Sequence, residues 1–375
     1  MGQRVILIIG GGIIGLSVAE ALSRRGLKPI VLEKGDFGRE ASWAGAGYLS
    51  LKSAALAGGP FLDLSLFSFR MYEPWVRLLE QESGMECEFR PGGSLEVAYG
   101  DGDAEALKKL HEDLRKAGVP AVWLSGSEAR GLEPELSPEA AAAIQMPDTA
   151  QVRPPRLIHA LLEILRKRGV ELRDQTPVSA LVTEGGKVRG VRTAREEIRG
   201  DAVVLAGGAW SGQLAERVGI HLPIKPIRGQ VVMFHGQPNL VNRVLFTQQA
   251  YLVPRQDGRI YVGSTLEDVG FNKNTTLQGT EELEEGAYRA VPKLRLAQLE
   301  SRWAGLRPGT PDGRPFLGPV PGVEGLVLAC GHYTHGLLLA PATGLLIDQY
   351  LRGEESDVPL EAFALNRPPQ DPVGI

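Results

Sequence analysis

The 375-residue chain contains only two cysteines, Cys87 and Cys330. Two thiols cannot form a disulfide framework or a zinc site, and this scarcity is typical of the reducing cytoplasm, which is the predicted location. His332 and His335 form an H-x-x-H pair, but no third ligand with a fitting spacing adjoins them. We therefore expect no metal centre.

Positive charge is not in excess either. Lys and Arg number 41 against 45 Asp and Glu, which gives a formal net charge of −4. Because nucleic acid attracts basic surfaces, it is not an expected partner. The one long apolar run, residues 5–22, is interrupted by glycines and by Ser17 and Glu20. We therefore expect neither a membrane span nor a signal peptide.

Glycine, in contrast, is abundant, with 47 residues, and its first cluster lies inside a predicted βαβ unit. Residues 5–9 are apolar and largely β-branched, as in a central parallel strand that is covered on both faces. A helical pattern follows as far as Arg25, and residues 29–33 predict a second short strand. Such a unit indicates an α/β domain.

The glycines between the first strand and the helix have the spacing Gly10-x-Gly12-x-x-Gly15. The first permits a tight turn, the second lets backbone approach a pyrophosphate, and the third lets the helix pack on the strand. Glu33, at the end of the second strand, is placed to accept hydrogen bonds from ribose hydroxyls. The pattern predicts a dinucleotide site; the alternative is a glycine-rich turn without a ligand.

The rest of the chain favours FAD over a nicotinamide cofactor. FAD is longer and is often held by distant segments, and residues 40–47, 206–210 and 331–336 are small, glycine-bearing segments beside predicted elements. Further strands are predicted at 92–99, 177–182, 188–192, 202–206, 230–234, 250–254, 259–263 and 326–329, and helices at 104–116, 154–168, 280–290 and 337–351.

These elements predict a discontinuous protein of two domains, because α/β parts at the start, centre and end enclose two strand-rich parts. Residues 1–85, 146–220 and 305–366 would form the FAD-binding domain. Residues 86–145 and 221–304 would form the substrate domain, and residues 367–375 a C-terminal tail.

A more specific block lies near the C-terminus. It runs Trp-Ala-Gly-Leu-Arg-Pro-Gly-Thr-Pro-Asp-Gly over residues 303–313 and continues with Gly-His-Tyr at 331–333 and with residues 336–344. With this block the chain resembles, over nearly its whole length, the D-amino-acid oxidase superfamily, and most closely the glycine oxidases of the thiamine pathway. The resemblance implies a discontinuous Rossmann-like FAD domain of glutathione-reductase type, an antiparallel-sheet (α+β) substrate domain, an α/β fold overall, and a homotetramer.

The resemblance also implies which residues bind the cofactor. Ile13 and Ile14 would contact the pyrophosphate through their amides, Glu33 and Lys34 would hold the adenosine, and Val178 would pair its backbone with adenine. The full implied set is Gly10, Gly12, Ile13, Ile14, Gly15, Glu33, Lys34, Ala41, Ser42, Ala46, Gly47, Tyr48, Val178, Gly207, His332, Tyr333, Thr334, His335, Gly336, Leu337 and Leu338.

Two residues are expected at the substrate. Arg307 offers a planar fork that matches a carboxylate, although a lone arginine can also serve a structural ion pair. Tyr251 resembles the family's active-site tyrosine, although it can also be an ordinary strand aromatic. Several family members carry Arg where this chain has Thr334, and Asn where it has His335, which puts substrate affinity and range in doubt.

The expected reaction is the FAD-dependent oxidative deamination of glycine, sarcosine or short D-amino acids by hydride transfer to flavin N5. It would give the imino or 2-oxo acid, ammonia and hydrogen peroxide, and would feed thiamine thiazole synthesis. We expect noncovalent FAD, because the sarcosine oxidase branch attaches its flavin through a cysteine just ahead of a comparable T-P-D, and residues 306–309 contain none.

Three other functions stay open. The first is a dehydrogenase of the same superfamily that uses a quinone or another carrier instead of dioxygen. The second is a flavoprotein that oxidises a glycine-like group on tRNA, which the lack of basic excess disfavours. The third is a non-catalytic FAD-binding module.

Overall fold

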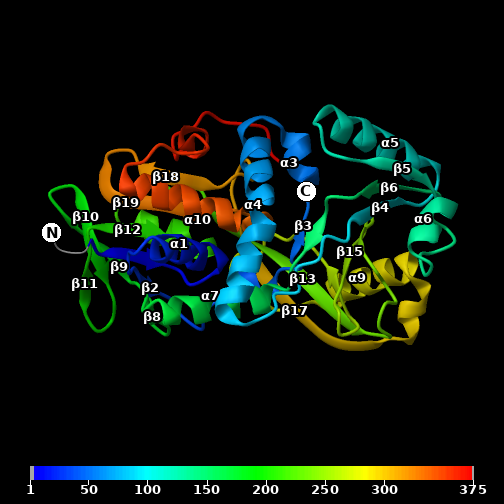
Figure 1. Ribbon diagram of the computed structural model, residues 1–375, viewed down its shortest axis with the longest axis horizontal. Helices are drawn as coiled ribbons and strands as arrows, with labels where there is room; N and C mark the ends of the chain where they lie inside the picture. The colour runs from blue at the N-terminus through cyan, green and yellow to red at the C-terminus, as the bar shows by residue number, and fades with distance from the viewer. Residues whose placement is uncertain (1–3, 374–375) are drawn as a thin grey trace.

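The computed structural model describes residues 4–373, whose strands form two large sheets and a small two-stranded one. The large sheets lie side by side along the long axis of the molecule, with the long helix α4 (Gly59–Ser83) between them (Figure 1). The left half of the view joins blue, green and orange segments, and the right half joins teal and yellow ones. Neither half is therefore one continuous stretch of chain.

Nine strands of the described chain form the first sheet, whose centre is parallel in the order β8-β2-β1-β12-β19. Antiparallel strands extend it, with β18 on β19 and with β9 and β11 on β10. The bounds are β1 Ile6–Ile9, β2 Ile30–Leu32, β8 Glu171–Arg173, β9 Ala180–Glu184, β10 Lys187–Arg192, β11 Glu197–Arg199, β12 Ala202–Leu205, β18 Phe316–Val320 and β19 Val323–Cys330.

Strand β1 explains why the first apolar run has no polar alternation. Ile6 and Ile8 belong to one buried cluster, and Leu7 and Ile9 belong to another on the opposite face. Successive side chains of a strand point to opposite faces, so a strand covered on both sides must be apolar throughout. The Ile6 face is covered by helices, namely α1 Ile13–Arg24, α4, α7 Pro154–Lys167 and α10 Gly336–Arg352.

The second sheet has the order β17-β13-β16-β15-β14-β4-β6-β5. Strands β14 and β4 are parallel, and the other neighbouring pairs are antiparallel. One face packs on α6 (Gly126–Leu132) and α9 (Leu277–Ala290). The bounds are β4 Ser94–Ala98, β5 Val122–Ser125, β6 Ala142–Met146, β13 Lys225–His235, β14 Val244–Phe246, β15 Tyr251–Pro254, β16 Arg259–Gly263 and β17 Gln298–Gly309.

The remaining α-helices and strands of the described chain are α2 Ala41–Ala44, β3 Tyr48–Leu49, α3 Lys52–Ala57, α5 Asp101–Lys116, β7 Ala150–Gln151 and α8 Ser211–Glu216. Strands β3 and β7 pair with each other beside the first sheet. Among residues 4–373, no helix is both long enough and apolar enough to cross a membrane.

The predicted fold class is confirmed, with a parallel-centred sheet beside a largely antiparallel one. The predicted domain boundaries remain a proposal, which the distribution of strands between the two sheets supports. Helix α4 was not predicted, because Pro74 lies inside it and the pattern around it is not clearly amphipathic. Its packing on α7 and α10 outweighs the local cost of the proline.

Candidate active site

A cavity of about 560 Å³ lies between the two sheets. On one side it is lined by the carboxyl ends of parallel strands, at Ile9, Leu32 and Leu205. Open α/β sheets bind ligands at this edge. On the other side it is lined by residues of five neighbouring strands of the second sheet, in the order β17-β13-β16-β15-β14.

The glycine motif forms the first wall of the cavity. Gly10 has φ +109°, and a Cβ there would lie 2.3 Å from the carbonyl oxygen of Ala206. A Cβ on Gly15 would lie 1.9 Å from the oxygen of Gly10, so this glycine lets α1 pack on the strand and does not line the cavity. Gly12 lines the cavity, and Ser42 Oγ accepts a hydrogen bond of 2.9 Å from the Ile13 amide. Gly12 thus leaves the start of α1 without a side chain, and the hydrogen bond from Ile13 to Ser42 holds this turn in place.

Glu33 and Lys34 lie beside this loop. The buried Glu33 carboxylate accepts hydrogen bonds from the amides of Gly11 (2.7 Å) and Gly35 (3.1 Å), which fix its direction. Its remaining lone pairs can still accept bonds from ribose hydroxyls. Lys34 Nζ lies 3.0 Å from the centre of the Trp210 ring, and burial lowers the pKa of its ammonium.

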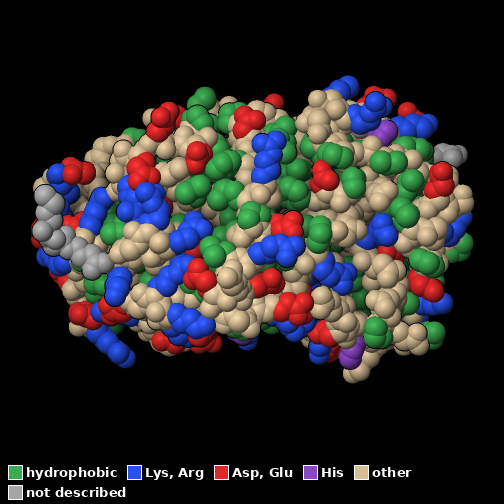
Figure 2. All heavy atoms as spheres, in the orientation of Figure 1, with side chains coloured by type: hydrophobic (Ala, Val, Ile, Leu, Met, Phe, Trp, Pro, Cys, Tyr) green, Lys and Arg blue, Asp and Glu red, His purple; other side chains and the backbone are tan. Residues whose placement is uncertain are grey.

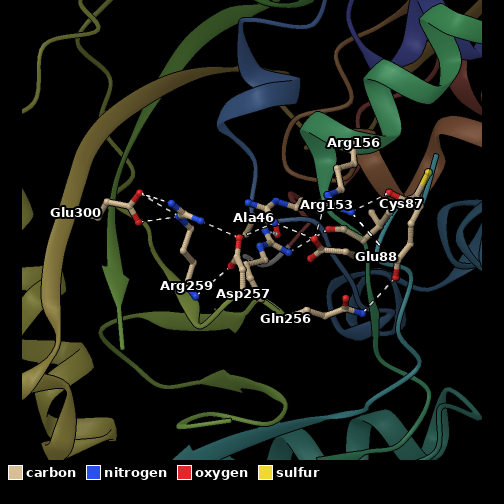
Figure 3. A network of polar contacts seen from close by, with 12 residues as sticks. Ala46, Cys87, Glu88, Arg153, Arg156, Gln256, Asp257, Arg259 and Glu300 are labelled. Carbon is tan, nitrogen blue, oxygen red and sulfur yellow. Dashed lines mark hydrogen bonds and ion pairs between the residues drawn. The ribbon is translucent and has the colours of Figure 1, made fainter. Parts of the chain in front are cut away.

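The segment after α2 also lines the cavity, and a buried arginine holds it. Arg255 donates from Nη1 to the Val152 carbonyl (3.2 Å) and from Nη2 to the Ala46 carbonyl. Burial lowers the pKa of this guanidinium to about 10, so it stays charged at neutral pH. Figure 3 shows the surrounding network, in which Arg153 pairs with both Glu88 and Asp257. Arg255 thus ties the second sheet to the segment that contains Ala46 and Gly47.

The N-terminus of α10 and the residues just before it also line the cavity. His332 and His335 both line it and are buried, and burial lowers the pKa of His332 to about 3 and that of His335 to about 4. Both imidazoles are therefore neutral at pH 7. His332 Nε2 is hydrogen-bonded to Thr343 Oγ1 at 3.0 Å, and His335 packs edge-on against Phe61.

Arg307 of β17 and Tyr251 of β15 meet where the second sheet lines the cavity. Arg307 donates to Ser264 Oγ from Nη2 and to the Thr265 carbonyl from Nη1 (3.2 Å), and Tyr251 donates its hydroxyl proton to the same Ser264 Oγ at 3.1 Å. Within the described residues Arg307 forms no ion pair with a carboxylate. In the alternative interpretation Arg307 is one half of a structural ion pair. The described residues contain no carboxylate that pairs with it.

The predicted site residues converge on this cavity. Every residue of the predicted cofactor set except Gly15 lines it, and so do Arg307 and Tyr251. Sequence reasoning did not identify Gly229, Tyr261 and Ser264, which also line it. A glycine in the middle of a strand, as at Gly229, is a signal of close approach to the backbone that could have been used.

Comparison with known proteins identifies the family. The chain matches the family model described as FAD dependent oxidoreductase (DAO) over residues 6–350. The chain belongs to this family.

Relatives of the chain agree with this assignment. The glycine oxidase of Pseudomonas aeruginosa is 38% identical over 356 residues, covering 95% of this chain and 96% of that one. The hydrogen cyanide synthase subunit HcnC of the same organism is 33% identical, covering 99% and 97%. The crystal structure of glycine oxidase from Geobacillus kaustophilus superposes with a TM-score of 0.93 at 31% identity, covering 98% of this chain and 100% of that one.

The chain is therefore an FAD-dependent oxidoreductase, and its cavity fits the cofactor. A dinucleotide needs a backbone loop without side chains at a helix N-terminus and a carboxylate at the end of the second strand, and Gly12 and Glu33 supply these. The Ile13 amide, which the resemblance assigns to the pyrophosphate, donates to Ser42 Oγ in this structure. The residues that would hold the isoalloxazine end are those of segment 44–48 and of segment 331–338.

The flavin is expected to be released by acid. Residues 306–309 contain no cysteine, and burial raises the pKa of the Cys330 thiol, which lines the cavity, to about 12. A thiol that stays protonated is a poor nucleophile. Acid precipitation of the holoprotein should leave the yellow colour in the supernatant, and a yellow pellet would contradict noncovalent binding.

The two buried histidines predict a loss of stability in acid. In the unfolded chain a histidine takes up its proton near pH 6.5, whereas His335 in the folded protein does so only near pH 4. The stabilisation is complete above pH 6.5 and is lost as the pH falls toward 4, by roughly 3 kcal/mol. The melting temperature of His335→Asn holoprotein should fall less between pH 7 and pH 4.5 than that of the wild type. His221→Asn, at an exposed histidine, is the control, and an unchanged slope for His335→Asn would contradict the prediction.

Proposed function

We propose that the protein oxidises glycine and small amines such as sarcosine or short D-amino acids, with dioxygen as the electron acceptor. The observation that carries the proposal is Arg307, a guanidinium that lines the cavity and pairs with no carboxylate of the described chain. Its hydrogen bonds to Ser264 and Thr265 fix the position of the fork. A small carboxylate ligand would supply the missing counter-charge.

The substrate end of the cavity suits a small ligand. Tyr48 packs edge-on against Tyr251, with ring centroids 5.0 Å apart, and Tyr251 stacks on Tyr261 at 6.1 Å. Burial raises the pKa of the Tyr48 and Tyr261 hydroxyls, so both stay protonated. The rings form a wall next to the fixed guanidinium of Arg307, and this environment suits a small ligand that carries a carboxylate.

Catalysis in this site would depend on how the substrate is positioned. Arg307 would bind the carboxylate through both terminal nitrogens, and Tyr251 would turn its hydroxyl proton from Ser264 to a carboxylate oxygen. The aromatic wall would exclude water from the α-carbon. FAD, held by the segments named above, would supply the two-electron acceptor between the amine and dioxygen. An oriented substrate needs no separate general base.

Similarity to named oxidases supports the substrate class. Besides the glycine oxidases, the bifunctional protein ThiO/ThiG of Synechocystis is 37% identical, covering 96% of this chain and 54% of that protein. This supports our proposal that the imino acid serves thiazole synthesis. A homotetramer and a cytoplasmic location belong to the same proposal; both cysteines are free and buried, which suits a reducing compartment.

The rival is a dehydrogenase that uses a quinone or another carrier. The relative named as a hydrogen cyanide synthase subunit keeps this rival open. It matches nearly the whole chain, and its name does not identify it as an oxidase. Catalysis on tRNA is disfavoured by the net charge of −4, and in Figure 2 acidic and basic side chains are interspersed over the visible face. Oxygen uptake with glycine, compared with reduction of an artificial acceptor, separates the oxidase from the dehydrogenase.

A further inference from the structure

The guanidinium of Arg307 lies directly on the backbone of the neighbouring strand. A Cβ on Gly229 of β13 would lie 2.1 Å from Nη1, 2.3 Å from Nη2 and 2.4 Å from Cζ of Arg307, whereas ordinary contacts begin at 3.4 Å. Arg307 pairs with Ile227 across the β13–β17 ladder, so its side chain runs diagonally along the sheet over Gly229. Any side chain at position 229 would occupy the space of the guanidinium.

The other side of the guanidinium is closed by the segment after β16. Ser264 Oγ and the Thr265 carbonyl accept its hydrogen bonds, and Ser264 also accepts the hydroxyl proton of Tyr251. The fork is thus enclosed between the backbone of β13 and residues 264–265. Both hydrogen bonds hold it in this position.

The backbone of β13 does not itself require glycine at position 229. Gly229 is absent from the described residues with positive φ and lies within the regular β13–β17 ladder, paired with Gly305. Glycine inside a strand lowers stability, because it packs no side chain and loses more conformational freedom on folding. The close approach of Arg307 explains why glycine nevertheless stands there.

We propose that Gly229 is a positioning residue for the substrate carboxylate. The space left by its missing side chain sets the place of the Arg307 guanidinium, and through it the place of the bound carboxylate. This inference rests on the proposed function, in which Arg307 binds that carboxylate.

The test is Gly229→Ala in the FAD-loaded protein. The atoms that the new methyl would meet are the end of a flexible side chain, so the fold can stay intact while the guanidinium moves by about 1 Å, which can cost up to about 100-fold. We expect the KM for glycine and the Kd for acetate, read from the flavin absorbance, to rise at least tenfold. FAD content and melting temperature should stay at wild-type values, as they should in Gly92→Ala, where a Cβ meets nothing within 4 Å.

A second background separates positioning from general damage. In Arg307→Lys the planar fork is absent, so Gly229→Ala should not weaken acetate binding further. The inference is overturned if Gly229→Ala leaves the acetate Kd unchanged, or weakens it equally in both backgrounds. If Arg307→Lys alone leaves acetate binding unchanged, the proposed carboxylate site itself fails, and the role of Gly229 fails with it.

Discussion

Arg307→Ala is expected to lower kcat/KM for glycine by 100- to 1000-fold while FAD remains bound. The variant removes two charge-assisted hydrogen bonds to the carboxylate, together about 3–4 kcal/mol, and each 1.4 kcal/mol is about tenfold. Arg307 contacts Ser264 and Thr265 in the described chain, so its removal leaves no buried carboxylate unpaired and the fold should persist. Steady-state kinetics together with the flavin-to-protein absorbance ratio measures both effects.

The matched control lies on the same strand. Arg302 of β17 pairs with Glu284 and is partly exposed. Arg302→Ala should leave kcat/KM within about twofold, since exposed ion pairs contribute little. Wild-type kinetics for Arg307→Ala, or an equal loss in both variants, would contradict the role of Arg307.

Gly12→Val should abolish stable FAD binding. Gly12 lines the cavity at the start of α1, where backbone must approach the pyrophosphate, and a Cβ there already lies 3.0 Å from Ser42 Oγ. The added side chain would fill the space beside the start of α1 and displace an anion from the amides of the helix N-terminus. This would weaken the binding free energy by about 3 kcal/mol or more. The purified variant should be colourless and should take up added FAD at least 100-fold more weakly.

Gly35→Val is the control for this effect. Gly35 lies in the adjoining loop, and a Cβ there meets nothing within 4 Å. Its amide still donates to Glu33, because a valine retains the backbone N–H. A full complement of FAD in Gly12→Val would show that the cofactor does not contact this loop.

The cofactor half of the site could be predicted because its signals are local. The strand, the glycine motif and the helix are contiguous within residues 6–24. Each glycine of the motif has its own structural reason, and the spacing of the glycines in the sequence shows where each one lies. Segments 206–210 and 331–336 were recognisable for the same reason, as glycines that follow buried strands β12 and β19. Residues that directly follow parallel strands lie together at the carboxyl edge of the sheet, however long the connections between the strands are.

The substrate half could be predicted only in part. Arg307 and Tyr251 were named from a family resemblance, but their meeting through Ser264 depends on how the distant strand β17 is aligned with β15 and β16, with β13 between them in the sheet. Arg255 reaches Ala46 across 209 positions, and no local pattern expresses that contact. Gly229 is one glycine among 47, and only the register of β13 on β17 shows which side chain covers it.

Anaerobic mixing of the purified holoprotein with glycine, sarcosine and small D-amino acids tests the central claim most directly. The account predicts that glycine or one of these relatives bleaches the flavin, and that air restores the yellow colour with formation of hydrogen peroxide. A flavin that none of these amines reduces would contradict it.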